Sequence, residues 1–302
     1  SDSLQNWVAR ELRYEKKNPN NSEICQYITQ CHRNKWDISD IIELYQKKPY
    51  YINNRQNSIN SINSHQKYDI TNLMDLKNQS VLDLGCGYKA ISLQKKCTGN
   101  YVGLDSDINV VDIPNVYAFD MCQLWSNQRE SFGNIYPYLK TFDQTTFNDR
   151  FQTILCLNAI HYAFKDPDSI NSFQQNLDYF GEKNTRFIVR YLDSNCLQLI
   201  FDQNNNKIVH ENGSFVRCNS DETITIYYNW VHNSPLIEPR INLNKLQKTF
   251  HNWSYQNELS NTLNQKNNQN NQNNFRQNKR NDSDIWSQYF NCFTYAVFLK
   301  NQ

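Results

Sequence analysis

Short apolar runs recur along the chain, and stretches with helix-like spacing of apolar residues separate them. The runs lie at Val81, Tyr101, Val116, residues 151–157 and residues 187–191. Because buried parallel strands are near-continuous apolar runs, this alternation predicts a doubly wound α/β fold with a mainly parallel sheet. A last run at residues 293–299 is predicted to close the sheet as its antiparallel member.

The other segments do not follow this alternation. Residues 1–52 have helical spacing and are interpreted as a helical extension in front of a domain that spans residues 53–302. Short strand-like runs within residues 205–245 predict a small lobe that is inserted before the sheet resumes. Residues 264–284 are rich in Asn and Gln, and this polar, biased composition predicts a disordered surface loop.

Composition limits the classes of function. The chain has 302 residues, of which 38% are hydrophobic, so it can form a large core although its mean hydropathy is -0.81. The net charge of +1 disfavours a protein that grips long duplex nucleic acid, and leaves open a site for one nucleotide or a short RNA end. No apolar run approaches the length of a membrane span, which predicts a soluble protein without a membrane partner.

The cysteines and the first residue bear on the cellular setting. The nine cysteines are scattered and never form a Cys-x-x-Cys pair. Neither a zinc site nor a disulfide framework fits that spacing, so we expect reduced thiols in an intracellular compartment and no metal. The chain starts at Ser1 without an initiator Met, which favours a segment of a longer polypeptide.

A glycine turn follows the first apolar run. Residues 81–87 read Val-Leu-Asp-Leu-Gly-Cys-Gly. Gly85 and Gly87 let the backbone come close to a ligand, and the carboxylate of Asp83 lies just before them. Because Ala90 occupies the third glycine position of a dinucleotide fingerprint, pyrophosphate binding is the weaker interpretation. The turn therefore predicts a site for a nucleotide-like cofactor.

Two further runs end in an acid. Asp105 ends the run that begins at Tyr101, and Asp120 ends the run that begins at Val116. On a parallel sheet these acids share an edge with the glycine turn, where Asp105 is placed to accept hydrogen bonds from ribose hydroxyls. The alternative is that either acid caps a helix or a turn, which is the commoner role of an isolated Asp. The three features in series favour a cofactor site.

The segment that follows the fourth apolar run carries the most specific indication of a substrate. Residues 154–164 read Ile-Leu-Cys-Leu-Asn-Ala-Ile-His-Tyr-Ala-Phe, which brings His161 and Tyr162 to the same sheet edge. The segment resembles the His-Tyr-(Ser/Ala)-Phe of the mRNA cap guanine-N7 methyltransferases. Residues 81–87 are identical to the glycine turn of that family. The chain is thus similar to a divergent member of this family, such as the methyltransferase domain of a viral or cytoplasmic capping enzyme.

Two further matches extend the resemblance toward the C-terminus. Glu238 follows an aromatic stretch, as the cap-contacting Glu of the family does, and Tyr295 lies in Tyr-Ala-Val-Phe, similar to the closing strand of the family. Without the family, Glu238 would be an ordinary loop acid and Tyr295 an ordinary core aromatic. The resemblance implies that the cap guanine is contacted by His161, Tyr162, Glu238 and Tyr295. It implies that the cofactor is bound by Asp83, Gly85, Cys86, Gly87, Asp105, Asp120, Lys67 and Lys89.

The resemblance also implies a fold and a reaction. The fold would be that of the Rossmann-like class I methyltransferases, with a small inserted cap-binding lobe. The reaction would transfer the methyl group of S-adenosylmethionine to guanine N7 of a GpppN cap and leave S-adenosylhomocysteine. Guanine N7 has a free lone pair at neutral pH, so positioning and electrostatics suffice, and no residue is expected as catalytic acid or base. The implied partners are 5′-capped RNA and RNA triphosphatase and guanylyltransferase domains.

The chain departs from the family pattern near the cofactor turn. Tyr88 and Lys89 follow Gly87 where the family has Lys-Gly-Gly, and Leu157 replaces a Gln that usually lies four residues before the His. Two alternatives stay open. One is another S-adenosylmethionine-dependent methyltransferase, acting on a small molecule, a protein or an RNA base, and the other is a non-catalytic capping subunit. We expect a cytoplasmic location, or the nucleus for a cellular enzyme and a virion or viral factory for a viral one.

Overall fold

The structure is a computed structural model that describes residues 70–97, 99–107, 110–111, 113–128, 150–210, 213–228, 235–277 and 284–301. The chain divides into two compact units, Ser1–Gln66 and Lys67–Gln302, and every described residue belongs to the second unit. The helical extension expected over residues 1–52 lies outside the described residues, and so does Lys67.

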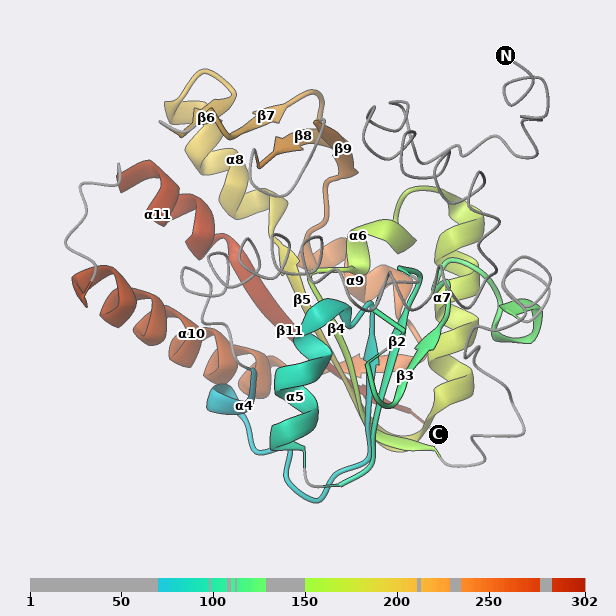
Figure 1. Cartoon of the computed structure of the whole chain (residues 1–302). Helices are drawn as coiled ribbons and strands as arrows, with labels where there is room; N and C mark the ends of the chain where they lie inside the picture. The colour runs from blue at the N-terminus through green and yellow to red at the C-terminus, as the bar shows by residue number, and fades with distance from the viewer. Residues whose placement is uncertain are drawn as a thin grey trace, which may run out of the picture. The chain divides into compact units, whose positions relative to one another are not determined.

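A seven-stranded sheet forms the centre of this unit (Figure 1). The strands lie in the order β10-β11-β5-β4-β1-β2-β3. Neighbours from β3 to β5 are parallel, whereas β11 is antiparallel to both β5 and β10. The predicted mainly parallel sheet with an antiparallel last strand is therefore confirmed. The strands are β1 Val81–Leu84, β2 Tyr101–Asp105, β3 Val116–Ala118, β4 Phe151–Leu157, β5 Gly181–Leu192, β10 Trp253–Tyr255 and β11 Phe293–Lys300.

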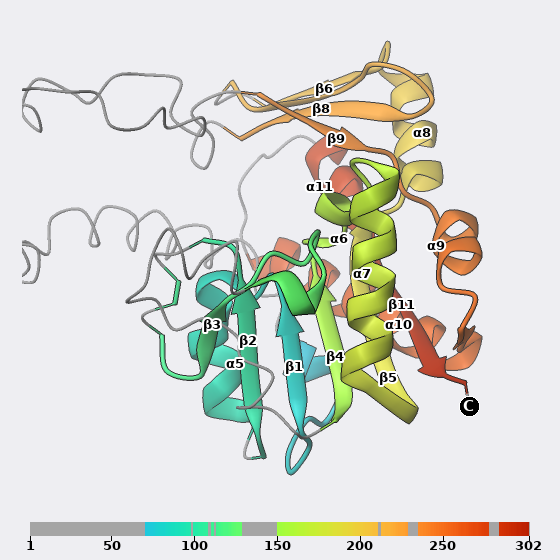
Figure 2. The same ribbon diagram turned by 90° about the vertical axis from the view of Figure 1, so that its right-hand side faces the viewer.

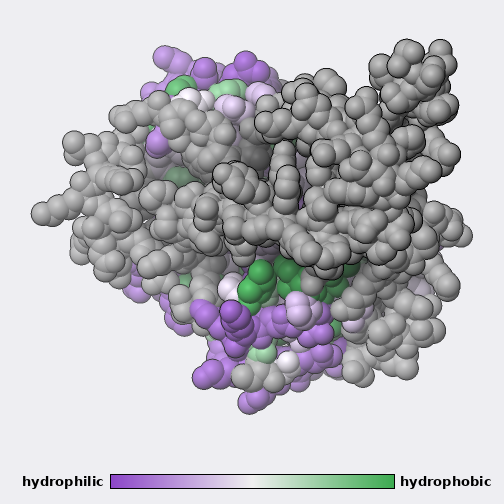
Figure 3. All heavy atoms as spheres, viewed as in Figure 1, coloured by the Kyte–Doolittle hydropathy of each residue, from purple (hydrophilic) through white to green (hydrophobic). Residues whose placement is uncertain are grey.

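Helices cover both faces of this sheet, which explains why its strands are apolar on both sides (Figure 2). Ile154 packs with α6, α7 and α9 on one face, and the next residue, Leu155, packs with α4, α5 and α10 on the other. The outer side of α5 carries Lys95 and Lys96, and hydrophilic residues gather over that helix in Figure 3. These helices are α4 Ile70–Leu73, α5 Ala90–Lys96, α6 Ile160–Ala163, α7 Pro167–Phe180, α9 Leu243–Thr249 and α10 Asn257–Gln277.

The long helix α7 starts at a capping signal that the sequence carries. Asp166 has an extended backbone, and its carboxylate accepts the backbone N–H of Ser169 at 2.7 Å. Pro167 occupies the first helical position, where its missing N–H costs nothing. The cap fixes where the chain turns from α6 into the helix that covers β4 and β5.

A second, antiparallel sheet lies above the carboxyl ends of the central strands in Figure 2. Its strands follow each other in chain order: β6 Lys207–Val209, β7 Phe215–Cys218, β8 Thr223–Tyr227 and β9 Leu236–Pro239. Ile208, Val216 and Ile226 form a core with α8 (Ser194–Gln203) and α11 (Asp284–Asn291). We call this sheet and these two helices the lobe. The four strands occupy the range of the inserted lobe expected from the sequence, and its role in substrate binding stays a prediction.

The Asn-rich segment is helical where the sequence predicts a disordered loop. Helix α10 continues to Gln277, which corrects the prediction over residues 264–277, and residues 278–283 lie outside the described residues. The reason is the free edge of β11 at residues 293–297, which β10 does not pair. Ser260 Oγ accepts the N–H of Val297 at 3.0 Å, and Asn264 bonds both the N–H and the C=O of Tyr295. Polar side chains on α10 thus replace the hydrogen bonds that a neighbouring strand would make.

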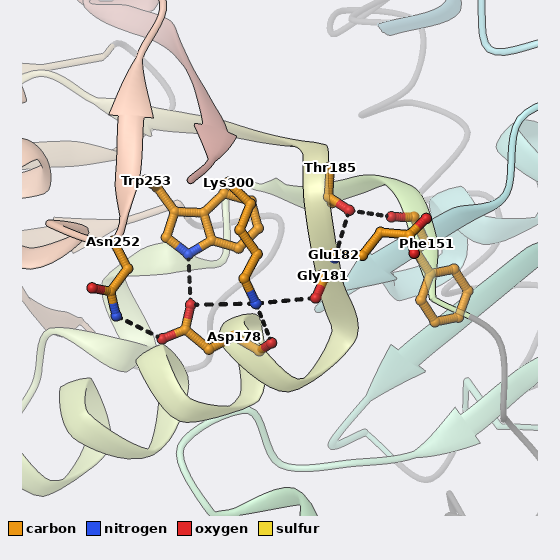
Figure 4. Close-up of polar contacts among 8 residues, drawn as sticks. All are labelled: Phe151, Asp178, Gly181, Glu182, Thr185, Asn252, Trp253 and Lys300. Carbon is orange, nitrogen blue, oxygen red and sulfur yellow. Dashed lines mark hydrogen bonds and ion pairs between the residues drawn. The ribbon is translucent and has the colours of Figure 1, made fainter. Parts of the chain in front are cut away.

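A polar network joins the opposite end of the sheet, away from the lobe (Figure 4). The carboxylate of Asp178, at the end of α7, accepts hydrogen bonds from Trp253 Nε1 at 2.9 Å and from Asn252 Nδ2 at 3.0 Å. Lys300 Nζ lies 3.8 Å from the same carboxylate and donates to the carbonyl of Gly181 at 3.0 Å. The side chains of Asp178 and Lys300 therefore tie α7 to β10, β11 and the start of β5.

Replacing Asp178 with Ala is expected to lower the free energy of unfolding by about 2 kcal/mol, because it leaves the buried indole N–H of Trp253 without its acceptor. Urea denaturation measures the change. Asp168→Ala, on the exposed first turn of the same helix, serves as the control and should cost less than about 1 kcal/mol. Equal losses in both variants would contradict the role given to the network.

Candidate active site

The glycine turn at the end of β1 has a left-handed backbone. Gly85 has φ of +66° and Gly87 has φ of +52°, a region that side chains other than glycine adopt only with strain. The carbonyl of Leu104, on β2, accepts the N–H of Gly85 at 2.8 Å and that of Cys86 at 3.2 Å. The next N–H, on Gly87, donates to Asp105 Oδ2 at 2.7 Å. The end of β2 thus accepts all three of these backbone N–H groups.

The two glycines are needed for different reasons. A Cβ on Gly85 would lie 2.5 Å from Cβ of Ala159, so the turn packs directly against the segment that leads into α6. A Cβ on Gly87 would meet no atom of the described residues within 4 Å. Gly85 is therefore a packing glycine, whereas Gly87 borders open space beside a backbone amide.

The predicted acids also cap the turns that follow them. Asp105 Oδ1 accepts the N–H of Asp107 at 2.8 Å, and Asp120 Oδ1 accepts the N–H of Cys122 at 2.9 Å. Burial raises the pKa of Asp105, and the hydrogen bonds from the backbone amides oppose that shift. Asp105 and Asp120 thus both cap turns, as the alternative interpretation predicts. Both also lie at the sheet edge that carries the glycine turn.

Asp83 lies beneath the turn and is 1% exposed. Its Oδ2 accepts a hydrogen bond from the hydroxyl of Tyr101 at 3.0 Å, while its buried Oδ1 has no hydrogen-bond partner among the described residues. Burial raises the pKa of Asp83 to about 7. The partly buried Lys89 faces the same region, and burial together with the charge of Arg190 lowers its pKa to about 8.

Cys86 contributes to packing through its side chain. A Cβ on Gly103 would lie 2.8 Å from the sulfur of Cys86, so the thiol fills the space that this glycine leaves on β2. Burial raises the pKa of the Cys86 thiol well above its usual range. Only the backbone of Cys86 faces the turn, and its predicted place in a cofactor site rests on that backbone.

Arg190 was not among the predicted site residues, although a cation inside the apolar run of residues 187–191 is a signal that could have marked it. It is 2% exposed on β5, and its guanidinium donates to the side chain of Asn158 at the end of β4. The guanidinium carbon lies 4.5 Å from the ring centroid of Phe293 on β11. This buried cation thus lies between the carboxyl end of β4 and the ring of Phe293.

Tyr295 lies next to this cation and not on an open surface. It pairs with Arg190 across β5 and β11, is 2% exposed, and packs in the core that α4, α5 and α10 cover. The ordinary core interpretation of Tyr295 therefore describes its place in the fold. Contact of this ring with a guanine stays a prediction.

The other three predicted acceptor residues lie together. His161 and Tyr162 are on α6, and Glu238 is on β9 of the lobe. The distance from His161 Nε2 to Glu238 Oε1 is 3.7 Å, and the rings of His161 and Tyr162 are 4.1 Å apart. Tyr162 is 53% exposed, whereas burial raises the pKa of Glu238 to about 7. Residues 77 positions apart in the chain thus form one cluster where the lobe meets the central sheet.

This cluster is connected to the cofactor turn. Ala159, which contacts the position of Gly85, begins the turn into α6. The thiol of Cys122 donates to the carbonyl of Tyr162 at 3.3 Å, which ties α6 to the loop that follows Asp120. The glycine turn, the acids and the His161–Glu238 pair therefore line one edge of the sheet.

Neither a cluster of metal ligands nor a membrane-spanning helix is present among the described residues. No group of three or more His, Cys, Asp or Glu side chains is arranged to hold a metal ion there. No described helix combines the length and apolar character of a membrane span.

The chain matches no family model and no curated protein sequence. Among solved structures it is similar to the PH0226 protein of Pyrococcus horikoshii OT3, with a TM-score of 0.46 and 12% identity over 86% of this chain and 99% of that one. A putative S-adenosylmethionine-dependent methyltransferase from Listeria monocytogenes matches with a TM-score of 0.40 and 13% identity over 76% and 94%. An S-adenosylmethionine-dependent methyltransferase from Mesorhizobium loti matches with a TM-score of 0.43 and 10% identity over 76% and 94%.

The fold assignment rests on the chain's own sheet. A parallel sheet with β1 at its centre, a glycine turn after β1, an acid at the end of β2 and a single antiparallel strand between β5 and β10 define the Rossmann-like class I methyltransferase fold. The fold class predicted from the sequence is thereby confirmed.

Protonation of Asp83 is expected to make stability depend on pH. The carboxyl of Asp83 ionises near pH 3.8 in the unfolded chain and near pH 7 in the folded one. Its contribution to the free energy of unfolding is therefore complete below pH 3.8 and is lost as the pH rises through 7. Between pH 3.8 and pH 7 the free energy of unfolding of the wild type should fall by about 4 kcal/mol relative to that of Asp83→Asn. Urea denaturation at a series of pH values measures it. The exposed Glu182→Gln should give curves parallel to the wild type, and parallel curves for Asp83→Asn would refute the assignment.

Proposed function

We propose that this protein is an S-adenosylmethionine-dependent methyltransferase that binds its cofactor at the carboxyl ends of β1 and β2. The observation that carries the proposal is the left-handed turn at Gly87, tied to Asp105 and bordered by open space. Close approach of a ligand to backbone requires such a space. The buried, unpaired Oδ1 of Asp83 beneath the turn adds a polar group that a bound ligand or a water can satisfy.

The residues of this edge divide the tasks of binding. Asp105 keeps acceptor capacity on both carboxylate oxygens for ribose hydroxyls, and Asp120 lies at the adjacent strand end for the adenine side. The amides of the turn lie on the methionine side, with Lys89 nearby. When bound, S-adenosylmethionine supplies a methyl group on a positively charged sulfonium. Participation of Lys67 stays a prediction from the resemblance.

We further propose that the acceptor is guanine N7 of an RNA cap. An imidazole and a carboxylate 3.7 Å apart, beside the exposed ring of Tyr162, supply hydrogen-bonding groups and an aromatic surface for a purine. Glu238 can accept from the guanine edge, and its negative charge favours the positive charge that develops on the ring. No residue has to accept a proton, because N7 carries a free lone pair.

Gly87→Ala is expected to weaken binding of S-adenosylhomocysteine by more than about tenfold, because the added methyl group enters the space beside the turn amide. Isothermal titration calorimetry measures the affinity. Gly213→Ala is the matched control: Gly213 also has a positive φ, of +87°, and also borders open space, but lies in the lobe hairpin. Its variant carries a similar backbone strain and should bind as the wild type does. A wild type that does not bind the compound at all would favour a non-catalytic subunit.

A panel of acceptors tests the cap assignment. Transfer of labelled methyl groups to GpppN-capped RNA is compared with transfer to ATP, uncapped RNA and protein. We expect methylation of capped RNA, with the product identified as 7-methylguanosine after digestion. A preference for any other acceptor would contradict the cap assignment and indicate another class of methyltransferase. The proposed binding of S-adenosylmethionine would not be affected.

Ionisation of Glu238 is expected to shape the pH profile of this reaction. Because its pKa is near 7 and the ionised form is the one that favours the charged ring, the rate should rise with pH through about 7 and then level off. Glu238→Gln should lower the rate by about 100-fold and remove that rise, without changing affinity for S-adenosylhomocysteine. Glu222→Gln, an exposed acid in the β7–β8 turn, is the control. A rise through pH 7 that persists in Glu238→Gln would exclude this role.

A further inference from the structure

The sheet of the lobe has two chemically different faces. Ile208, Val216, Ile224 and Ile226 point to the inner face and pack with α8 and α11. The strand register assigns the alternate positions to the outer face. These outer positions are Lys207 and Val209 on β6, Phe215 and Arg217 on β7, Thr223, Thr225 and Tyr227 on β8, and Ile237 and Pro239 on β9.

Aromatic rings and cations alternate on this outer face. Phe215 and Tyr227 are directly paired, partly exposed, and have ring centroids 5.6 Å apart. Lys207 and Arg217 are exposed and directly paired, and Lys207 Nζ lies 5.2 Å from the ring of Phe215. Phe215 is thus next to a cation, and Tyr227 is paired with Phe215. In Figure 3 hydrophobic residues lie among hydrophilic ones at the top of the view, where the lobe is located.

The charge on this face has one sign. None of the outer strand positions is an acid, whereas the inner face contains Glu238. Glu211, between β6 and β7 in the chain, lies outside the described residues, and Asp221 and Glu222 lie in the turn between β7 and β8. That turn follows the Cys218–Ile224 pair, at the opposite end of the strands from Phe215 and Tyr227. At the described strand positions of this face a polyanion would therefore meet two cations, Lys207 and Arg217, and no acid.

We propose that the outer face of the lobe binds single-stranded RNA, with bases stacked on Phe215 and Tyr227 and phosphates at Lys207 and Arg217. Unpaired bases can stack on aromatic side chains of a sheet, whereas bases inside a duplex are not accessible. The exposed aliphatic side chains of Val209 and Ile237, which are 53% and 73% exposed, extend the apolar surface on both sides of the pair. A protein partner would not require two exposed cations on the same face as the aromatic pair.

The outer face is a site separate from the His161–Glu238 cluster. β9 is the edge strand of the lobe, with Glu238 on its inner face and Ile237 on its outer face. An RNA whose capped end lies at Glu238 can pass over this edge to reach the aromatic pair. That path rests on the proposed function, whereas binding of uncapped RNA to the outer face does not.

Fluorescence anisotropy with an uncapped, single-stranded oligouridine tests the proposal on the full chain. The double variant Lys207→Glu, Arg217→Glu should weaken binding more than tenfold, and lower the salt slope by about 1.4, the value for two phosphate contacts on a single strand. The control is Lys77→Glu, Lys95→Glu, which makes the same change in charge at exposed positions before β1 and on α5. It should keep most of the affinity.

A second pair of variants tests stacking without a change in charge. Tyr227→Ala should weaken binding about tenfold, and Tyr227→Phe, which keeps the ring, should bind as the wild type does. Thermal unfolding of each variant verifies that the lobe is still folded. A duplex RNA of the same length should bind more weakly than the single strand.

Three outcomes would overturn the proposal. They are equal weakening by the two charge variants, equal affinity for duplex and single strand, and unchanged RNA binding in Lys207→Glu, Arg217→Glu with an altered sedimentation coefficient. The last would identify the face as an interface between copies of the chain. Because the probe carries no cap and the assay needs no cofactor, failure of the cap assignment would leave this result unaffected.

Discussion

The hydrogen bond from the Gly87 N–H to Asp105 is the interaction on which the rest of the site depends. It joins the ends of two parallel strands, and it does so through a left-handed backbone conformation that favours glycine. Leu104 completes the attachment by accepting the two preceding amides. Because Gly85 in this turn contacts Ala159, the same geometry fixes the start of α6, and with it the position of His161. The glycine turn therefore positions both the predicted cofactor site and the His161–Glu238 cluster.

Beneath this edge the sheet buries polar groups at a cost. Asp83 is almost fully buried with a single hydrogen bond to one oxygen, and Arg190 is buried between β4 and β11. Burial of a carboxylate without full compensation raises its pKa, as happens at Asp83. Low-dielectric surroundings also strengthen electrostatic interactions with any charged ligand above them. The cost is thus concentrated at the place where a charged ligand is expected to bind.

The lobe and α10 show how the chain uses polar residues outside the site. Helix α10 satisfies the free edge of β11 with the side chains of Ser260 and Asn264, so its polar composition serves structure. In the lobe the inner face is apolar except near Glu238, and the outer face has cations beside aromatic rings. Polar residues outside the site therefore have different roles: those on α10 bond the backbone of β11, and those on the outer face of the lobe lie beside aromatic rings.

The sequence by itself determined six of the seven strands of the central sheet, including the antiparallel β11, and the glycine turn, whereas β10 was not predicted. Apolar runs and left-handed glycine positions are local properties, and they act over a few residues. Only the tertiary structure decided that Asp105 holds Gly87, that His161 meets Glu238, and that Tyr295 is buried beside Arg190. It also decided that the Asn-rich segment is a helix to Gln277, because the free edge of β11 that it satisfies lies in a distant part of the chain. Such pairings depend on contacts across long sequence separations, and no local pattern of residue types records them.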